Sequence, residues 1–193
     1  MPSFISKADW SALRDELKNL LTAEEYAAAN RSILDAHFTS MDVVSGMWGA
    51  AKHLGFRGGR VLEPSVGVGN FFGAMPKDPR ANSPLYGVEL DNITGQIAKY
   101  LYPNAAVATP AGFQDVEFPS NSFDFATGNP PFGEQSLYDP AHPEFRSFSI
   151  HQFFFAKALD KVRPGGILQM VVSRYLLDSR DAAGFAAREY LAK

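Results

Sequence analysis

The pattern of apolar positions at the start of the chain has the period of an α-helix. Four apolar residues recur at three- and four-residue spacing: Trp10, Leu13, Leu17 and Leu20. Thr22 followed by Glu25 is a capping-box pattern, which predicts the start of a second helix. We expect residues 1–35 to form a helical extension that packs, or dimerises, through its apolar face.

A third helix is predicted from just after Ser40 to about Leu54, with Gly55 as the residue that ends it. Its apolar face would consist of Val43, Val44, Met47, Trp48 and Ala51. This helix would open the second domain, which we place at residues 36–193.

Beyond this helix the pattern alternates between short apolar strands and helices. Strands are expected at 60–63, 85–90, 105–108, 123–127 and 167–172, and helices after Asp91, at 150–162 and at 182–192. Residues 163–166, Arg-Pro-Gly-Gly, would close the helix before the last strand. This alternation predicts an α/β, Rossmann-like fold: a mostly parallel sheet with helices on both faces. Residues 133–147 lack periodicity, and so long a loop is typical of a lid or a binding loop.

Composition and charge narrow the function classes. The absence of cysteine excludes disulfides, thiolate metal sites and a cysteine nucleophile, and fits a reducing cytoplasm. No apolar run approaches the roughly 20 residues that a membrane span needs, and the N-terminus lacks the apolar stretch of a signal peptide. With a net charge of −3, this domain alone is expected to bind nucleic acid weakly.

The first chemical motif is a glycine-containing turn after the strand at 60–63. Gly67 and Gly69 allow close approach of a ligand to the backbone, but Phe72 stands where a dinucleotide-binding loop has its third glycine. Glu63, at the end of the strand, would repel a phosphate and suit a ligand that carries an ammonium and a sulfonium group. Taken alone, the turn is equally compatible with a purely structural role.

A second carboxylate, Glu89, follows the next strand about 20 residues later, where ribose hydroxyls are expected in such folds. One carboxylate can accept hydrogen bonds from two vicinal hydroxyls. An exposed glutamate without a ligand is the alternative interpretation.

The third motif is the strand at 123–127 that runs into Asn129-Pro130-Pro131-Phe132. The two prolines cannot continue a ladder and leave their carbonyl groups free to accept. The Asn129 side chain and the Pro130 carbonyl could together hold an exocyclic amino group. Phe132 could stack on the ring that bears this group.

These motifs together resemble those of the amino-methyltransferase family that depends on S-adenosylmethionine (SAM), in particular the DNA adenine-N6 methyltransferases. Residues 63–69 resemble the SAM-binding motif, residues 129–132 the catalytic tetrapeptide, and residues 36–40 the segment that closes over SAM. Residues 149–159 and 163–166 are similar to the methylase portion of methyltransferase–helicase proteins of mobile elements.

The resemblance implies a transferase that methylates DNA in a restriction-modification or mobile-element setting. It implies a SAM site formed by Phe38, Thr39, Glu63, Pro64, Ser65, Gly67, Gly69, Glu89, Leu90, Phe113, Gln114 and Asp115, and a catalytic site formed by Asn129, Pro130, Pro131 and Phe132. Gln114 and Asp115 compete for the position of an acidic residue that family members carry after the third strand. The final strand hairpin and the DNA-recognition region of complete members are not found, so we expect a longer protein or a partner that grips the DNA.

Other interpretations stay open. Enzymes that methylate a glutamine amide use the same tetrapeptide chemistry, usually with tyrosine at the position of Phe132. A SAM-binding module without catalysis, or an anti-restriction domain of a helicase-linked protein, would also fit. Arg146, Arg174 and Arg180 could meet phosphates or could be ordinary solvated charges. The histidines at positions 37, 53, 142 and 151 show no metal-binding spacing, so no metal is expected.

Overall fold

The computed structural model describes residues 7–27, 39–133 and 135–192, and the chain divides into two units, Met1–His37 and Phe38–Lys193. In the first unit, helix α1 spans Lys7–Leu20, and residues 23–27 are helical. The predicted capping box is confirmed: Thr22 N donates to the Glu25 carboxylate at 2.8 Å, and Glu25 N donates to Thr22 Oγ1 at 3.2 Å. The four apolar residues that indicated α1 are all exposed, so the packing role of this helix stays a prediction.

The second unit opens with helix α3, Met41–His53, as predicted. Ser40 caps it by accepting a hydrogen bond from Val43 N, and Gly55 follows the helix with a φ of 97°. Val44, Trp48 and Ala51 are buried, whereas Val43 is exposed because it lies at the margin of the apolar face.

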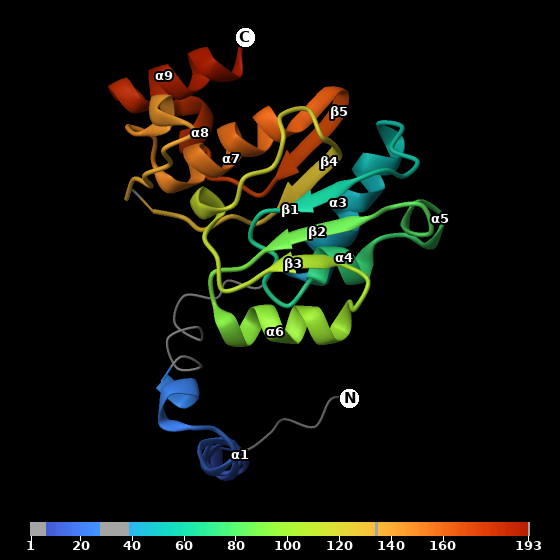
Figure 1. Cartoon of the computed structure of the whole chain (residues 1–193), viewed down its shortest axis with the longest axis vertical. Helices are drawn as coiled ribbons and strands as arrows, with labels where there is room; N and C mark the ends of the chain where they lie inside the picture. Colours follow the sequence, from blue (N-terminus) through green and yellow to red (C-terminus); the bar gives the residue numbers. More distant parts are fainter. Residues whose placement is uncertain (1–6, 28–38, 134, 193) are drawn as a thin grey trace. The chain divides into compact units, whose positions relative to one another are not determined.

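Five parallel strands form the sheet, in the order β3-β2-β1-β4-β5 (Figure 1). They are β1 (Val61–Glu63), β2 (Leu85–Val88), β3 (Ala106–Ala108), β4 (Phe123–Gly128) and β5 (Val162–Met170). The predicted α/β, Rossmann-like class is therefore confirmed. The strand order reverses between β1 and β4, which is where ligands bind in folds of this kind.

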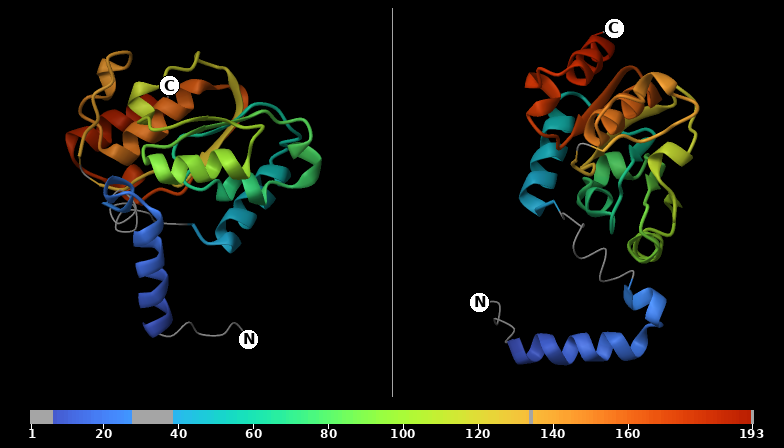
Figure 2. Two further views of the ribbon diagram at one scale, coloured as in Figure 1. Left: turned by 60° about the horizontal axis from the view of Figure 1, so that its bottom comes forward. Right: turned by 90° about the vertical axis from the view of Figure 1, so that its left-hand side faces the viewer.

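Helices cover both faces of the sheet (Figure 2). The further helices are α4 (Asn70–Ala74), α5 (Lys77–Arg80), α6 (Asn92–Leu101), α7 (Ile150–Lys161), α8 (Tyr175–Asp178) and α9 (Ala182–Leu191), with 3-10 turns at Phe113–Asp115 and Pro143–Phe145. One core cluster joins α3, α4 and α6 to one face of the sheet, around Trp48, Phe72 and Phe125. The other joins α7 and α9 to the opposite face, around Phe145 and Phe153.

Strand β5 begins earlier than the sequence predicted. Phe123 pairs with Val162 and Phe125 pairs with Ile167, so residues 163–166 form a bulge opposite Asp124. The Asp124 carboxylate fastens this bulge by accepting from Arg163 Nε at 2.7 Å and from Arg60 N at 2.8 Å. Proline and glycine are tolerated here because β5 lies at the edge of the sheet and the bulge needs no regular ladder. The strand ends at Met170, which leaves residues 171–172 outside it.

Part of the long loop before α7 is built into the core. Phe145 and Phe148 are buried, and Asp139, only 2% exposed, accepts a hydrogen bond from the buried Lys157 at 2.7 Å. Among the described residues, no helix has both the length and the apolar character required to cross a membrane.

Candidate active site at the carboxyl ends of the strands

The sheet register brings the ends of β1, β2 and β4 to one edge. Leu62 pairs with Ala126 in β4, and Glu63 pairs with Gly87 in β2. Just past these pairs, Ser65 Oγ donates to the backbone carbonyl of Asn129 at 3.2 Å. The glycine turn and the Asn-Pro-Pro-Phe segment, far apart in the sequence, are thus in direct contact.

The carboxyl group of Glu63 is buried in surroundings that disfavour its ionised form. Its side chain is 2% exposed, and within the described part of the chain its Oε2 atom makes no hydrogen bond. Burial, together with the nearby negative charge of Glu89, raises the pKa of Glu63 well above its usual value. Because a buried charged or polar group without a partner is costly, this carboxylate is suited to a cationic ligand group.

Both glycines of the turn after β1 have a positive φ, and Gly69 is needed for a steric reason as well. Gly67 has a φ of 55° and Gly69 a φ of 86°, values that other residues adopt only with strain. A side chain on Gly69 would also collide with the ring of Tyr102, whereas the space beside Gly67 is open. A ligand can therefore approach the backbone at Gly67.

Glu89 lies just past β2 and fastens this turn. Its two carboxylate oxygens accept from Gly67 N at 2.8 Å and from Asp91 N at 2.9 Å. Burial raises the pKa of Glu89, and these two N–H donors offset the rise only in part. Each oxygen retains a further lone pair for a ligand hydroxyl. Sequence reasoning placed Glu89 at the site but did not find its bond to Gly67, which depends on how the turn folds back.

The segment after β3 lies beside Glu89, because Ala111 N donates to the Glu89 carbonyl at 3.0 Å. The three residues proposed there have different environments. Phe113 is buried in the core against Phe154, with ring centroids 5.3 Å apart. Gln114 is half-buried and donates to the exposed Asp115 carboxylate at 2.9 Å.

The other proposed cofactor residues are placed less deeply or cannot be placed. Pro64 is buried, Ser65 and Thr39 are half-buried, and Leu90 is exposed. Phe38 lies outside the described residues, so the segment expected to close over the cofactor is described only from Thr39 onward.

The tetrapeptide follows β4 directly. Pro130 is buried and Asn129 half-buried, whereas Pro131 and Phe132 are exposed. Phe132 lines a pocket of about 1010 Å³, which Arg174 and Arg180 also line. Arg146 is not part of this lining. The structure thus brings two of the three arginines that were candidates for phosphate contacts to the tetrapeptide.

His151, which sequence reasoning set aside, lines the same pocket from the first turn of α7. Burial lowers the pKa of its imidazole, so the ring is neutral at neutral pH. The only signal for it in the sequence was a histidine within an apolar helix.

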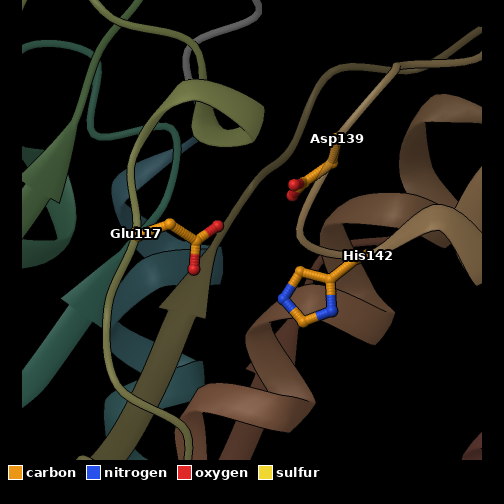
Figure 3. Close-up of side chains that lie close together, drawn as sticks. All are labelled: Glu117, Asp139 and His142. Atoms are coloured by element: carbon orange, nitrogen blue, oxygen red, sulfur yellow. The ribbon is translucent and has the colours of Figure 1, made fainter.

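A second group of titratable side chains surrounds Lys157, whose Nζ atom lies 5.1 Å from the ring centroid of Phe113. Glu117, Asp139 and His142 converge, with one ligand atom of each within 4.8 Å of the others (Figure 3). Two buried lysines already bind them: Lys157 Nζ lies 2.7 Å from Asp139, and Lys161 Nζ lies 3.2 Å from His142. Burial pushes the pKa of Asp139 upward, but the hydrogen bond and charge of Lys157 outweigh this effect and leave it lowered. The cluster is therefore an ion-pair network that ties the long loop to α7.

Comparison with known proteins places this geometry in a family. The family model of the Eco57I restriction-modification methylases matches residues 80–193, more than half of the 193-residue chain. The chain belongs to this family. The resemblance seen in the sequence to restriction-modification methylases is thereby confirmed.

Relatives of this Eco57I-family chain are longer proteins. It is 27% identical over 169 residues to the defense against restriction protein B of Escherichia phage P1, a match that covers 86% of this chain and 7% of that protein. The fold is similar to that of a modification subunit of a putative type I restriction enzyme from Vibrio vulnificus, with a TM-score of 0.67 and 18% identity over 98% of this chain and 44% of that one. It is also similar to a type I restriction-modification methyltransferase subunit from Streptococcus thermophilus, with a TM-score of 0.66 and 19% identity over 81% and 38% of the two chains.

Proposed function

We propose that this chain is the catalytic core of a SAM-dependent methyltransferase that methylates the N6 amino group of adenine in DNA. The observation that carries the proposal is the contact between the glycine turn and the tetrapeptide, beside the buried Glu63 carboxylate. This arrangement supports a cationic methyl donor and an amine acceptor at one edge of the sheet.

The residues at this edge fit the donor. Glu63 would bind the amino group of the methionine moiety and so gain the partner that its Oε2 atom lacks. Glu89 would accept hydrogen bonds from the ribose hydroxyls with its remaining lone pairs. The open space beside Gly67 would allow the cofactor to approach the backbone of the turn. Gln114 or Asp115, in the segment that Ala111 joins to Glu89, would meet the adenine moiety. When bound, SAM supplies an activated methyl group on a sulfonium centre.

The residues of the tetrapeptide would position the acceptor. The Asn129 side-chain carbonyl and the Pro130 backbone carbonyl accept the two N–H bonds of the amino group, which orients its lone pair toward the methyl group. These acceptors also stabilise the positive charge that develops on nitrogen during transfer. The exposed ring of Phe132 stacks on the base. Alignment and electrostatics carry the reaction, and it requires no covalent nucleophile.

DNA must present the base outside the duplex, because a stacked and paired adenine cannot reach Asn129. Arg174 and Arg180 would contact phosphates next to the extruded nucleotide, since both line the pocket that begins at Phe132. The net charge of −3 makes this core a weak DNA binder by itself, so we propose that other parts of the protein or a partner hold the duplex.

A second candidate is an anti-restriction role within a larger protein. It is favoured by the similarity to the phage P1 protein, whose name is defense against restriction protein B. In that case methylation would protect the DNA of a mobile element, or the domain would act without transferring a methyl group.

Substrate choice can be tested with SAM labelled in its methyl group. The full-length protein would be incubated with duplex DNA, single-stranded DNA and a glutamine-containing protein, and each digest analysed by mass spectrometry. Label in N6-methyladenine is expected. Label in a glutamine amide alone would refute the DNA assignment while preserving the transfer chemistry, and cofactor binding without transfer to any acceptor would favour the non-catalytic alternative.

A further inference from the structure

We propose that His151 is a positioning residue for methyl transfer. It would fix the backbone directly after the tetrapeptide, so that Asn129 and Phe132 keep the orientation that the acceptor base requires. This inference rests on the proposed function, but the contact on which it depends lies within the chain itself.

The tetrapeptide is held at both ends. At its start, the Asn129 carbonyl accepts from Ser65 Oγ at 3.2 Å, which ties it to the glycine turn. At its end, the Gly133 backbone is a hydrogen-bond partner of the His151 imidazole, and both residues line the pocket that Phe132 lines. Gly133 also lies close to the first turn of α7, since a Cβ atom on it would be 3.7 Å from Ile150 Cγ2. The tetrapeptide is thus attached to the glycine turn at one end and to α7 at the other.

The imidazole is in a state suited to this role. It is 8% exposed, and Ser149 Oγ lies 3.3 Å from its Nδ1 atom. Burial lowers its pKa, and the hydrogen bond to the Gly133 backbone offsets part of this shift. A neutral imidazole has a single N–H group, and Ser149 Oγ lies within reach of both ring nitrogens, at 3.3 Å from Nδ1 and 3.4 Å from Nε2.

The surrounding charges do not stabilise a protonated ring. The pocket beside His151 is also lined by Arg174, which caps α8, by Asp178 at the end of α8, and by Arg180 and Asp181, which precede α9. Arg174 and Asp178 pair with each other at 3.6 Å, and Asp181 caps α9 by accepting from Gly184 N. Among the residues that the structure describes, His151 forms no ion pair. The imidazole is therefore held by the Gly133 backbone and the Ser149 hydroxyl and not by an ion pair.

Methyl transfer is sensitive to the position of the reacting groups, because a displacement of about 1 Å can lower the rate roughly 100-fold. We therefore expect His151→Phe, which keeps the size and the apolar packing, to lower kcat by about 10- to 100-fold. SAM affinity should stay close to that of the wild type, since the cofactor turn is fastened separately by Glu89.

The experiment compares His151→Phe with His151→Asn and His151→Gln, whose amide groups reach the places of Nδ1 and Nε2. One of the two amides should restore kcat, because its N–H group can donate to the Gly133 carbonyl in place of the imidazole. His142→Phe is the matched control, since His142 lies in the loop before α7, stacks on Phe145 and contacts Lys161 instead of Gly133.

Hydrogen exchange of the peptide that contains residues 129–133 gives a readout that does not require catalysis. Faster exchange in His151→Phe, but not in His142→Phe, is expected. If the wild type transfers no methyl group, the proposed function fails, and the exchange result still decides whether His151 holds this segment. Unchanged exchange, or kcat of His151→Phe equal to that of the wild type, would overturn the positioning role.

Discussion

Replacing Glu63 by glutamine should stabilise the free protein and weaken its binding of SAM. Glutamine has the same shape as glutamate but carries no charge, and Glu63 is almost fully buried with one oxygen lacking a hydrogen bond. A buried polar group without a partner costs about 1–3 kcal/mol, and more if it is charged. Glu63→Gln should therefore raise the free energy of unfolding of the free protein by about 1–3 kcal/mol at alkaline pH.

The contribution of Glu63 to the free energy of unfolding depends on pH. Burial raises the pKa of Glu63 in the folded protein well above its ordinary value of 4.5. The native state then binds the proton more tightly than the unfolded state, so the stability contribution is complete below 4.5 and is lost as pH rises through the folded-state pKa. This loss should be present in the wild type and absent in Glu63→Gln.

Cofactor binding should respond in the opposite direction. An ammonium group beside Glu63 favours the ionised carboxylate, so the affinity of the wild type for SAM should increase with pH, with release of a proton. Glu63→Gln should remove this pH dependence and weaken binding by about 10- to 100-fold, the equivalent of roughly 1.4–2.8 kcal/mol.

Calorimetric titration in buffers of different ionisation enthalpy measures both the affinity and the released proton, and thermal unfolding measures stability. Glu16→Gln, at an exposed carboxylate of α1, is the matched control and should change neither quantity. Wild-type SAM affinity in Glu63→Gln, together with unchanged stability, would refute the role of Glu63 as the partner of a cation.

Three further substitutions test the remaining contacts. Glu89→Ala should weaken SAM binding by about 1–3 kcal/mol in calorimetry, because it removes a charged acceptor and frees the turn at Gly67; unchanged affinity would exclude Glu89 from the cofactor site. Phe132→Ala should weaken binding of single-stranded DNA to the full-length protein by about 1–3 kcal/mol without altering SAM affinity, and an equal loss of both would indicate general damage. Arg180→Ala should reduce the salt dependence of DNA binding by the equivalent of about one phosphate contact. Arg57→Ala, between α3 and β1, should not. Equal slopes of log binding constant against log salt concentration for the two variants would contradict the phosphate contact.

Local patterns were sufficient to predict most elements of the fold. Asp91 was recognisable as a helix cap because a cap acts on amide groups a few residues away, and it accepts from Thr94 N at 2.7 Å as expected. The parallel sheet followed from the alternation of strands and helices, which reflects burial of the strands on both faces.

Features that depend on distant partners could not be predicted. The start of β5 is set by its register with β4 and by the Asp124 carboxylate, which lies far from it in the sequence. The lack of a hydrogen bond at Glu63 Oε2 within the described residues, and the contact of His151 with Gly133 just after the tetrapeptide, likewise arise only when three strands and α7 meet. The sequence indicated which residue types form the candidate site, whereas the structure supplied their electrostatic states.

The most direct test of the account measures methyl transfer to DNA by Asn129→Ala in the full-length protein. Asn129 lies past the end of β4, so its loss should leave the fold intact and change SAM affinity little. Loss of one such preorganised group typically lowers kcat by ~100- to 1000-fold. We predict a loss of N6-methyladenine formation on this scale. The SAM affinity measured by calorimetry should stay close to that of the wild type. Wild-type turnover in Asn129→Ala would contradict the assignment of residues 129–132 as the site that holds the acceptor amine.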